Sequence, residues 1–396
     1  PIAVIGMSCR FPGGCNSPEA FWQLLDRGGD AITQVPADRW DAKSYYHPQP
    51  ATPGKIITTD GGFLDSVREF DAHFFGISPK EAASLDPQQR MLLEVSWEAM
   101  ERAGVVPAQW NGQKIGVFVG ISAHDYSRHL MARPLHEIDA YLATGNSHSV
   151  AAGRLSYTFG FTGPSLGVDT ACSSSLVALH AACQGLHSGE CRAALVGGVN
   201  CILSPELSMT FSQARMLSPD GRCKTFAADA NGFVRSEGCG VVVLKRLSEA
   251  QAAGDTILAV VRGSAINQDG RSGGLTVPHG PSQQAVIEAA LTQADVRHSQ
   301  IHYLEAHGTG TQLGDPIELG RNFRVVGREL DLILYVTGRR AGDGLAALGQ
   351  RRGPRAPGIV GFGAVAAASF DGDARTFRLM SAPFDGTPAR VDAEIF

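Results

Sequence analysis

The chain has 396 residues, of which 43% are apolar and 18% charged, and its net charge is −5. That length supports one large domain or two medium ones around a sizeable core, and the composition is typical of a globular protein. The weak negative charge argues against nucleic acid or an anionic membrane surface as a partner. No apolar run reaches the eighteen residues of a membrane span.

The eight cysteines all lie before residue 240 and form neither a CxxC pair nor a zinc-ligand spacing. We therefore expect no bound metal and a reducing compartment, the cytoplasm. No signal peptide is predicted. The sequence does not begin with an initiator Met, and we therefore expect it to be a piece of a longer polypeptide.

The first elements in chain order are a strand over residues 2–6 and a helix that begins at Ser17-Pro18 and stops at Gly28-Gly29. Residues 36–65 carry no clear period and are predicted to be a loop. Asp86-Pro87 begins the longest helix of this half, which runs to Gly104, and residues 114–121 form the next strand.

An extended segment at 165–168 precedes a helix over 173–188 and a strand over 193–200. Apolar, β-branched runs predict strands over 239–247 and 256–263. A helix over 282–295 and a strand over 301–306 then lead into the Gly-rich turn 308–314. Alternating strands and helices predict an α/β fold with mainly buried sheets and a weak division into two halves near 248–255.

Cys172 lies in residues 169–175 (DTACSSS), directly after the extended segment and at the start of a helix. Free amides and the positive end of the helix dipole lower a thiol pKa there, and the thiolate is the nucleophilic form. Most free cysteines are buried, small apolar residues, and we interpret the other seven in that way. The helix start and the three serines favour a nucleophile at Cys172.

His307 lies in residues 305–311 (EAHGTGT), at the end of a predicted strand. A histidine serves as a general base or donates a hydrogen bond to a developing oxyanion. The flanking glycines allow a substrate arm to approach closely. Thr309 and Thr311 offer hydroxyls to an arm that carries amides.

Residues 319–396 differ in composition from the rest of the chain, since they hold eleven Arg but no Lys, His or Cys. Three interpretations stay open for this tail: a disordered segment, an unusual subdomain, or translation in a shifted reading frame.

Long, ordered motifs between residues 1 and 318 resemble the β-ketoacyl synthase domain of type I polyketide synthases, including the related mycobacterial lipid synthases. The matching segments are residues 2–12 (IAVIGMSCRFP), 86–90 (DPQQR), 163–176 (GPSLGVDTACSSSL), 216–222 (MLSPDGR), 235–238 (RSEG), 267–271 (NQDGR) and 305–318 (EAHGTGTQLGDPIE).

This resemblance implies a thiolase-like αβαβα sandwich of two similar halves. It implies that Cys172 accepts an acyl chain from the phosphopantetheine of an acyl carrier protein, with no cofactor bound to the chain itself. A malonyl or methylmalonyl thioester then loses CO₂ and condenses with the acyl group, assisted by His307. Thr309 and Thr311 would bind the pantetheine arm, and the chain would form a homodimer.

The chain departs from the family pattern after residue 318. The family has a second histidine in a Lys-Thr-Asn-Ile-Gly-His segment, whereas this chain has no His after His307 and no Lys after Lys245. We therefore expect an N-terminal half over residues 1–247 and the start of a C-terminal half over residues 248–318. The second half is expected to be incomplete, and the condensation activity to be impaired. A non-catalytic remnant that only dimerises or docks a carrier protein is the alternative. A thiolase or chalcone-synthase relative fits the two motifs less well.

Overall fold

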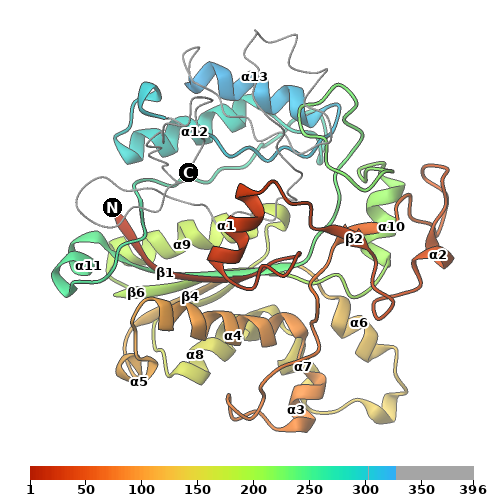
Figure 1. The fold of residues 1–396 in the computed structure, drawn as a ribbon. Helices are drawn as coiled ribbons and strands as arrows, with labels where there is room; N and C mark the ends of the chain where they lie inside the picture. The colour runs from red at the N-terminus through yellow and green to blue at the C-terminus, as the bar shows by residue number, and fades with distance from the viewer. Residues whose placement is uncertain (302, 327–396) are drawn as a thin grey trace.

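The computed structural model describes residues 1–301 and 303–326, and its centre is a six-stranded mixed sheet (Figure 1). The strand order is β5-β4-β6-β7-β1-β8. Strands β5, β4 and β6 run parallel, whereas β7 is antiparallel to both β6 and β1, and β8 is antiparallel to β1. The strands are β1 (Ile2–Arg10), β4 (Ile115–Gly120), β5 (Ser165–Val168), β6 (Ala193–Asn200), β7 (Gly238–Arg246) and β8 (Ala259–Val261).

Both faces of this sheet are buried over its four central strands, because residues of β1, β4, β6 and β7 enter two different hydrophobic clusters. Ala3 and Ile5 of β1 pack in the larger cluster, beneath the sheet in Figure 1, while Ile2 and Val4 pack in the cluster on the opposite face. The sequence of a strand that is covered on both sides is a continuous apolar run, as in residues 2–6.

Helices α4 (Pro87–Arg102) and α8 (His148–Phe159) cover the lower face of the sheet in Figure 1. The predicted start of α4 is confirmed: the Asp86 side chain accepts a hydrogen bond from the Gln88 N–H at 2.8 Å, and Pro87 occupies the first turn. Leu92, Val95 and Ala99 form its buried stripe.

Helix α9 (Ser174–Ser188) covers the opposite face. It approaches β4 so closely that a Cβ on Gly120 would lie 2.5 Å from the Ser175 nitrogen. A glycine at the end of β4 therefore allows the first turn of α9, which follows Cys172, to sit directly on the sheet.

Helices α12 (Gly280–Ala294) and α13 (Gly314–Val326) lie against each other above α9 in Figure 1. A small separate core of Leu291, Ala294, Val296 and Ile301 forms beneath α12. These helices bring the segment around residue 307 over the start of α9.

The remaining elements are short and surround the sheet. They are α1 (Pro18–Asp26), β2 (Ile32–Gln34), α2 (Ala42–Tyr45), β3 (Asp60–Gly62), α3 (Pro79–Ser84), α5 (Pro107–Trp110), α6 (Asp125–Met131), η1 (Leu135–Glu137), α7 (Tyr141–Asn146), η2 (Ala171–Ser173), α10 (Glu206–Gln213), α11 (Leu247–Ala253) and η3 (His298–Gln300). No helix of residues 1–301 or 303–326 is long and apolar enough to cross a membrane.

Two of the predicted segments are wrong. Residues 36–65 are not all loop, because they contain α2 and also β3, which pairs with β2. Residues 301 and 303–306 form no strand, since no neighbouring strand within the described residues offers them backbone hydrogen bonds. Most of the predicted tail, residues 319–396, lies outside the described residues. Its first residues belong to α13, which continues to Val326.

Candidate active site

Cys172 is exposed in the turn that joins β5 to α9. Ala171 before it has a φ of +56°, in the left-handed region that a residue with a Cβ rarely adopts. Hydrogen bonds hold this turn: the Ala171 N–H donates to Asp169 Oδ1 at 3.0 Å. The Ser174 hydroxyl accepts from the Thr170 N–H at 2.9 Å and donates to the Ala171 carbonyl at 2.6 Å. The turn is thus fixed in a strained shape that presents the sulfur.

The His307 imidazole lies within hydrogen-bonding reach of the Cys172 thiol, and this contact is the main cause that lowers the pKa of Cys172. Burial acts in the opposite direction. The same hydrogen bond is the main cause that raises the pKa of His307, with Glu318 and Asp315 adding smaller contributions of the same sign. The two shifts together favour a thiolate–imidazolium pair.

Six other thiols show the reverse behaviour, because burial raises the pKa of each of them. The pKa rises to about 12 for Cys9 and Cys183 and to about 11 for Cys191, and it is also raised for Cys15, Cys201 and Cys239. These six side chains are buried, as their sequence contexts indicate, whereas Cys223 is half-buried beside the His307 turn. Cys172 alone among the eight is exposed.

The backbone of the His307 turn is held by the carboxylate of Glu318, on α13. Its two oxygens accept the N–H groups of His307 and Gly308 at 2.6 and 2.9 Å. The sequence motif contains this glutamate, but the motif alone does not predict its role, because that role depends on α13 folding back over the turn.

Asp315, at the start of α13, is buried and holds the next part of the same turn. Its carboxylate accepts the Gly310 N–H at 3.0 Å and the Phe226 N–H at 2.7 Å. Gly310 adopts a φ of +67°, and its carbonyl accepts the Gly232 N–H at 2.8 Å. The turn is therefore anchored both to α13 and to the loops that precede β7.

Thr309 and Thr311 are half-buried and bond to each other, with their hydroxyl oxygens 3.0 Å apart. The Thr311 hydroxyl also accepts the Gly314 N–H at 3.1 Å, at the start of α13. Both threonines thus have a local structural partner in addition to any contact with a substrate arm.

The structure adds a cause that the sequence interpretation lacks. The hydrogen bond to His307 is the main cause that lowers the pKa of Cys172, and a backbone hydrogen bond at Cys172 lowers it further. Sequence position could not reveal this pairing, since the two residues lie 135 positions apart in the chain. Within residues 1–301 and 303–326, no group of three or more His, Cys, Asp or Glu side chains is arranged to hold a metal ion.

Residues 1–250 match the family described as Beta-ketoacyl synthase, N-terminal domain, and residues 258–349 match Beta-ketoacyl synthase, C-terminal domain. The chain is 58% identical over 323 residues to a phenolphthiocerol/phthiocerol polyketide synthase protein of Mycobacterium tuberculosis H37Rv. That alignment covers 81% of this chain and 15% of the relative. The chain thus spans a small part of the curated relative's length.

Two solved structures share this fold. An oxazolomycin ketosynthase domain from Streptomyces albus JA3453 matches with a TM-score of 0.76 and 42% identity, covering 82% of this chain and 56% of that chain. The ketosynthase from module 6 of the bacillaene synthase of Bacillus subtilis 168 matches with a TM-score of 0.74 and 41% identity, covering 82% and 54%. With the exposed Cys172, its His307 partner and these matches, the chain belongs to the β-ketoacyl synthase family and has its thiolase-like α/β fold.

Proposed function

We propose that this chain performs the condensing reaction of a polyketide synthase, with Cys172 as the nucleophile. The observation that carries the proposal is the contrast among the thiols: the exposed Cys172 has a pKa lowered by His307, while burial raises the pKa of six others. Only a thiolate at an accessible position can attack a carrier-bound thioester.

In the first step, the Cys172 sulfur attacks the thioester carbonyl of an acyl-phosphopantetheine on an acyl carrier protein. The acyl–Cys172 thioester forms, and the pantetheine sulfur leaves and takes a proton from His307. Thr309 and Thr311 contact the pantetheine arm in this proposal. The phosphopantetheine belongs to the carrier, so the chain holds no cofactor of its own.

In the second step, a malonyl or methylmalonyl thioester on a carrier loses CO₂. The resulting carbanion attacks the acyl–Cys172 carbonyl, a carbon–carbon bond forms, and the Cys172 thiolate leaves. His307 donates a hydrogen bond to the thioester oxygen that becomes negative. The product is a β-ketoacyl thioester.

Condensation is proposed to be impaired, because no second histidine follows His307 in the sequence. Loss of one oxyanion donor typically lowers a rate by about 10²–10³, and loss of acid–base assistance by about 10²–10⁴. Acylation of Cys172 needs only the Cys172–His307 pair and is expected to persist.

Radiolabelled acyl- and malonyl-carrier proteins test both steps separately. Acyl label should appear on Cys172 and vanish in Cys172→Ala, while Cys223→Ser, which removes the other thiol that is not buried, keeps it. Robust β-ketoacyl product would contradict the impairment. No acyl label on Cys172 would contradict the enzymatic proposal and favour the alternative, a scaffold that only dimerises or docks a carrier protein.

A homodimer in the cytoplasm completes the proposal. Strand β5 is an edge strand that pairs only with β4 within the described residues, and its Leu166 is 47% exposed. An exposed strand edge favours pairing with a second copy. No disulfide links the eight cysteines, all of which lie within the described residues, and this supports a reducing compartment.

A further inference from the structure

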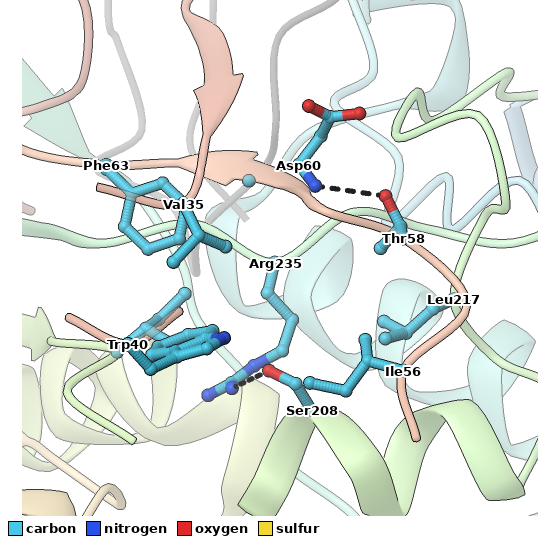
Figure 2. Close-up of a pocket in the computed structure, with 11 residues that line it drawn as sticks. Val35, Trp40, Ile56, Thr58, Asp60, Phe63, Ser208, Leu217 and Arg235 are labelled. Carbon is cyan, nitrogen blue, oxygen red and sulfur yellow. Dashed lines mark hydrogen bonds between the residues drawn. The ribbon is translucent and has the colours of Figure 1, made fainter. Parts of the chain in front are cut away.

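A pocket away from Cys172 lies between the paired strands β2 and β3 and helix α10, and its wall holds one arginine (Figure 2). The pocket is small, with an enclosed volume of about 20 Å³, and it is partly open to solvent. Most of its lining is apolar or aromatic. The lining residues are Val35, Trp40, Ile56, Thr58, Asp60, Gly61, Phe63, Ile202, Ser208, Leu217 and Arg235.

Arg235 has few partners for a side chain that offers five N–H donors. Its Nη1 donates to the Ser208 hydroxyl at 2.8 Å, as the dashed line in Figure 2 shows. Its guanidinium carbon also lies 5.6 Å from the centre of the Phe211 ring. Within residues 1–301 and 303–326, no carboxylate forms an ion pair with it. Burial lowers the pKa of Arg235 to about 10, so the charged form lacks full compensation.

The nearest acidic groups, Asp125 and Glu237, already have partners. Glu237 pairs with Arg39 and accepts the N–H groups of Leu64 and Ile202. Asp125 accepts the N–H groups of Leu203 and Ser204 at 3.0 and 3.2 Å. Both carboxylates act on Arg235 only through space, and they partly offset its charge.

Asp60 also lines the pocket, but Figure 2 shows its carboxyl group pointing away from the Arg235 guanidinium. The Asp60 backbone N–H, not its carboxylate, bonds to Thr58 within the pocket wall.

Two other well-covered arginines have carboxylate partners. Arg39, with a side chain only 3% exposed, pairs with Glu237 and Asp38, and Arg154, at 9%, pairs with Glu81. Buried charges are normally paired, because desolvation is costly without a counter-ion. Arg235 forms no such ion pair within the described residues and lines the pocket instead.

We propose that this pocket binds a small carboxylate ion, of the size of formate or acetate, through the Arg235 guanidinium. The planar guanidinium presents paired donors that match the two oxygens of a carboxylate. The apolar wall, which includes Trp40 and Phe63, then covers the short alkyl end of the ligand. This site is separate from Cys172 and His307, neither of which lines the pocket.

Thermal unfolding of the full chain in sodium acetate tests the proposal, at constant pH and ionic strength, with sodium chloride as the comparison salt. Acetate should raise the midpoint in a saturable manner, because a ligand that binds only the folded state stabilises it. Arg235→Met should weaken the apparent affinity roughly tenfold or more, the effect expected for a lost charge-assisted hydrogen bond. Arg128→Met, at an exposed position on α6, should bind acetate as the wild type does.

A crystal structure of the wild type grown in acetate provides the second measurement and does not depend on the variant folding. The proposal predicts an acetate carboxylate within hydrogen-bonding distance of the Arg235 nitrogens. Water alone at that position would overturn it. Equal midpoint shifts with acetate and chloride, or a shift with chloride only, would overturn it as well, since the site would then not select a carboxylate.

Discussion

At the scale of single residues, the proposed chemistry depends on one pair of side chains, Cys172 and His307. Each shifts the pKa of the other toward the charged forms: the thiol pKa falls, which favours the thiolate, and the imidazole pKa rises, which favours the imidazolium. Glu318 and Asp315 support the imidazolium electrostatically and also fix the backbone on which it is carried. The pKa of the Cys172 thiol is therefore lowered mainly by the imidazole, and the turn that carries this imidazole is held by two carboxylates.

Replacing the imidazole should change how Cys172 reacts with pH. In His307→Ala the hydrogen bond that lowers the thiol pKa is lost, whereas the burial that raises it remains. The pH midpoint for alkylation of Cys172 by iodoacetamide should move upward, and the rate at pH 7 should fall by roughly tenfold or more. Mass spectrometry of alkylated peptides over a pH series measures both.

The control for this experiment is His129→Ala, which removes an exposed histidine on α6. Its alkylation profile at Cys172 should match that of the wild type. An unchanged profile in His307→Ala would show that the helix start, and not the imidazole, sets the pKa of Cys172.

At the scale of elements, the proposed nucleophile is positioned by the contact between β4 and the start of α9. Gly120 leaves no side chain between them, and Gly198 of β6 similarly faces Ser175, where an added Cβ would lie 2.8 Å from the Ser175 Cβ. The two small residues allow the turn at Cys172 to stand at the end of the sheet, within reach of His307.

A methyl group at position 120 should therefore disturb both stability and the site. Its Cβ would meet the Ser175 nitrogen at 2.5 Å and the Ser174 carbonyl carbon at 2.7 Å, so α9 must shift. We expect Gly120→Ala to lower the free energy of unfolding by roughly 1–3 kcal/mol and to slow alkylation of Cys172. Urea unfolding and the alkylation rate measure the two effects.

Gly153→Ala is a matched control, since this glycine of α8 has no atom within 4 Å of an added Cβ. Because alanine favours a helix interior over glycine, this variant should gain up to about 1 kcal/mol. A destabilisation of the same size in both variants would contradict the assignment of the effect to the α9 contact.

At the scale of the whole molecule, the central sheet has two edge strands within the described residues. Strand β8 forms one edge, and β5, whose Leu166 is exposed, forms the other and leads directly to Cys172. Association through β5 would therefore place a second copy next to the nucleophile turn.

Leu166→Glu tests this association, because a charge on an exposed edge strand opposes strand pairing. Analytical ultracentrifugation should show a dimer for the wild type and a shift toward monomer for Leu166→Glu. Leu275→Glu, at a fully exposed loop position, should leave the dimer unchanged. A wild-type monomer, or a Leu166→Glu dimer as stable as the wild type, would contradict the homodimer.

The amino-acid sequence by itself determined the local elements and indicated Cys172 as the candidate nucleophile. Apolar runs predicted β1, β4, β6 and β7, capping residues predicted α1 and α4, and residues 169–175 identified Cys172, because these signals depend on near neighbours in the chain. The motif that contains His307 was likewise visible without coordinates.

Only the tertiary structure decided which groups act on one another. The Cys172–His307 hydrogen bond, the contacts of Glu318 with the turn and the bond from Arg235 to Ser208 arise between segments far apart in the chain, so no local pattern encodes them. The predicted strand at 301–306 failed for the same reason. A strand needs a neighbour to pair with, and a neighbour is a property of the folded chain.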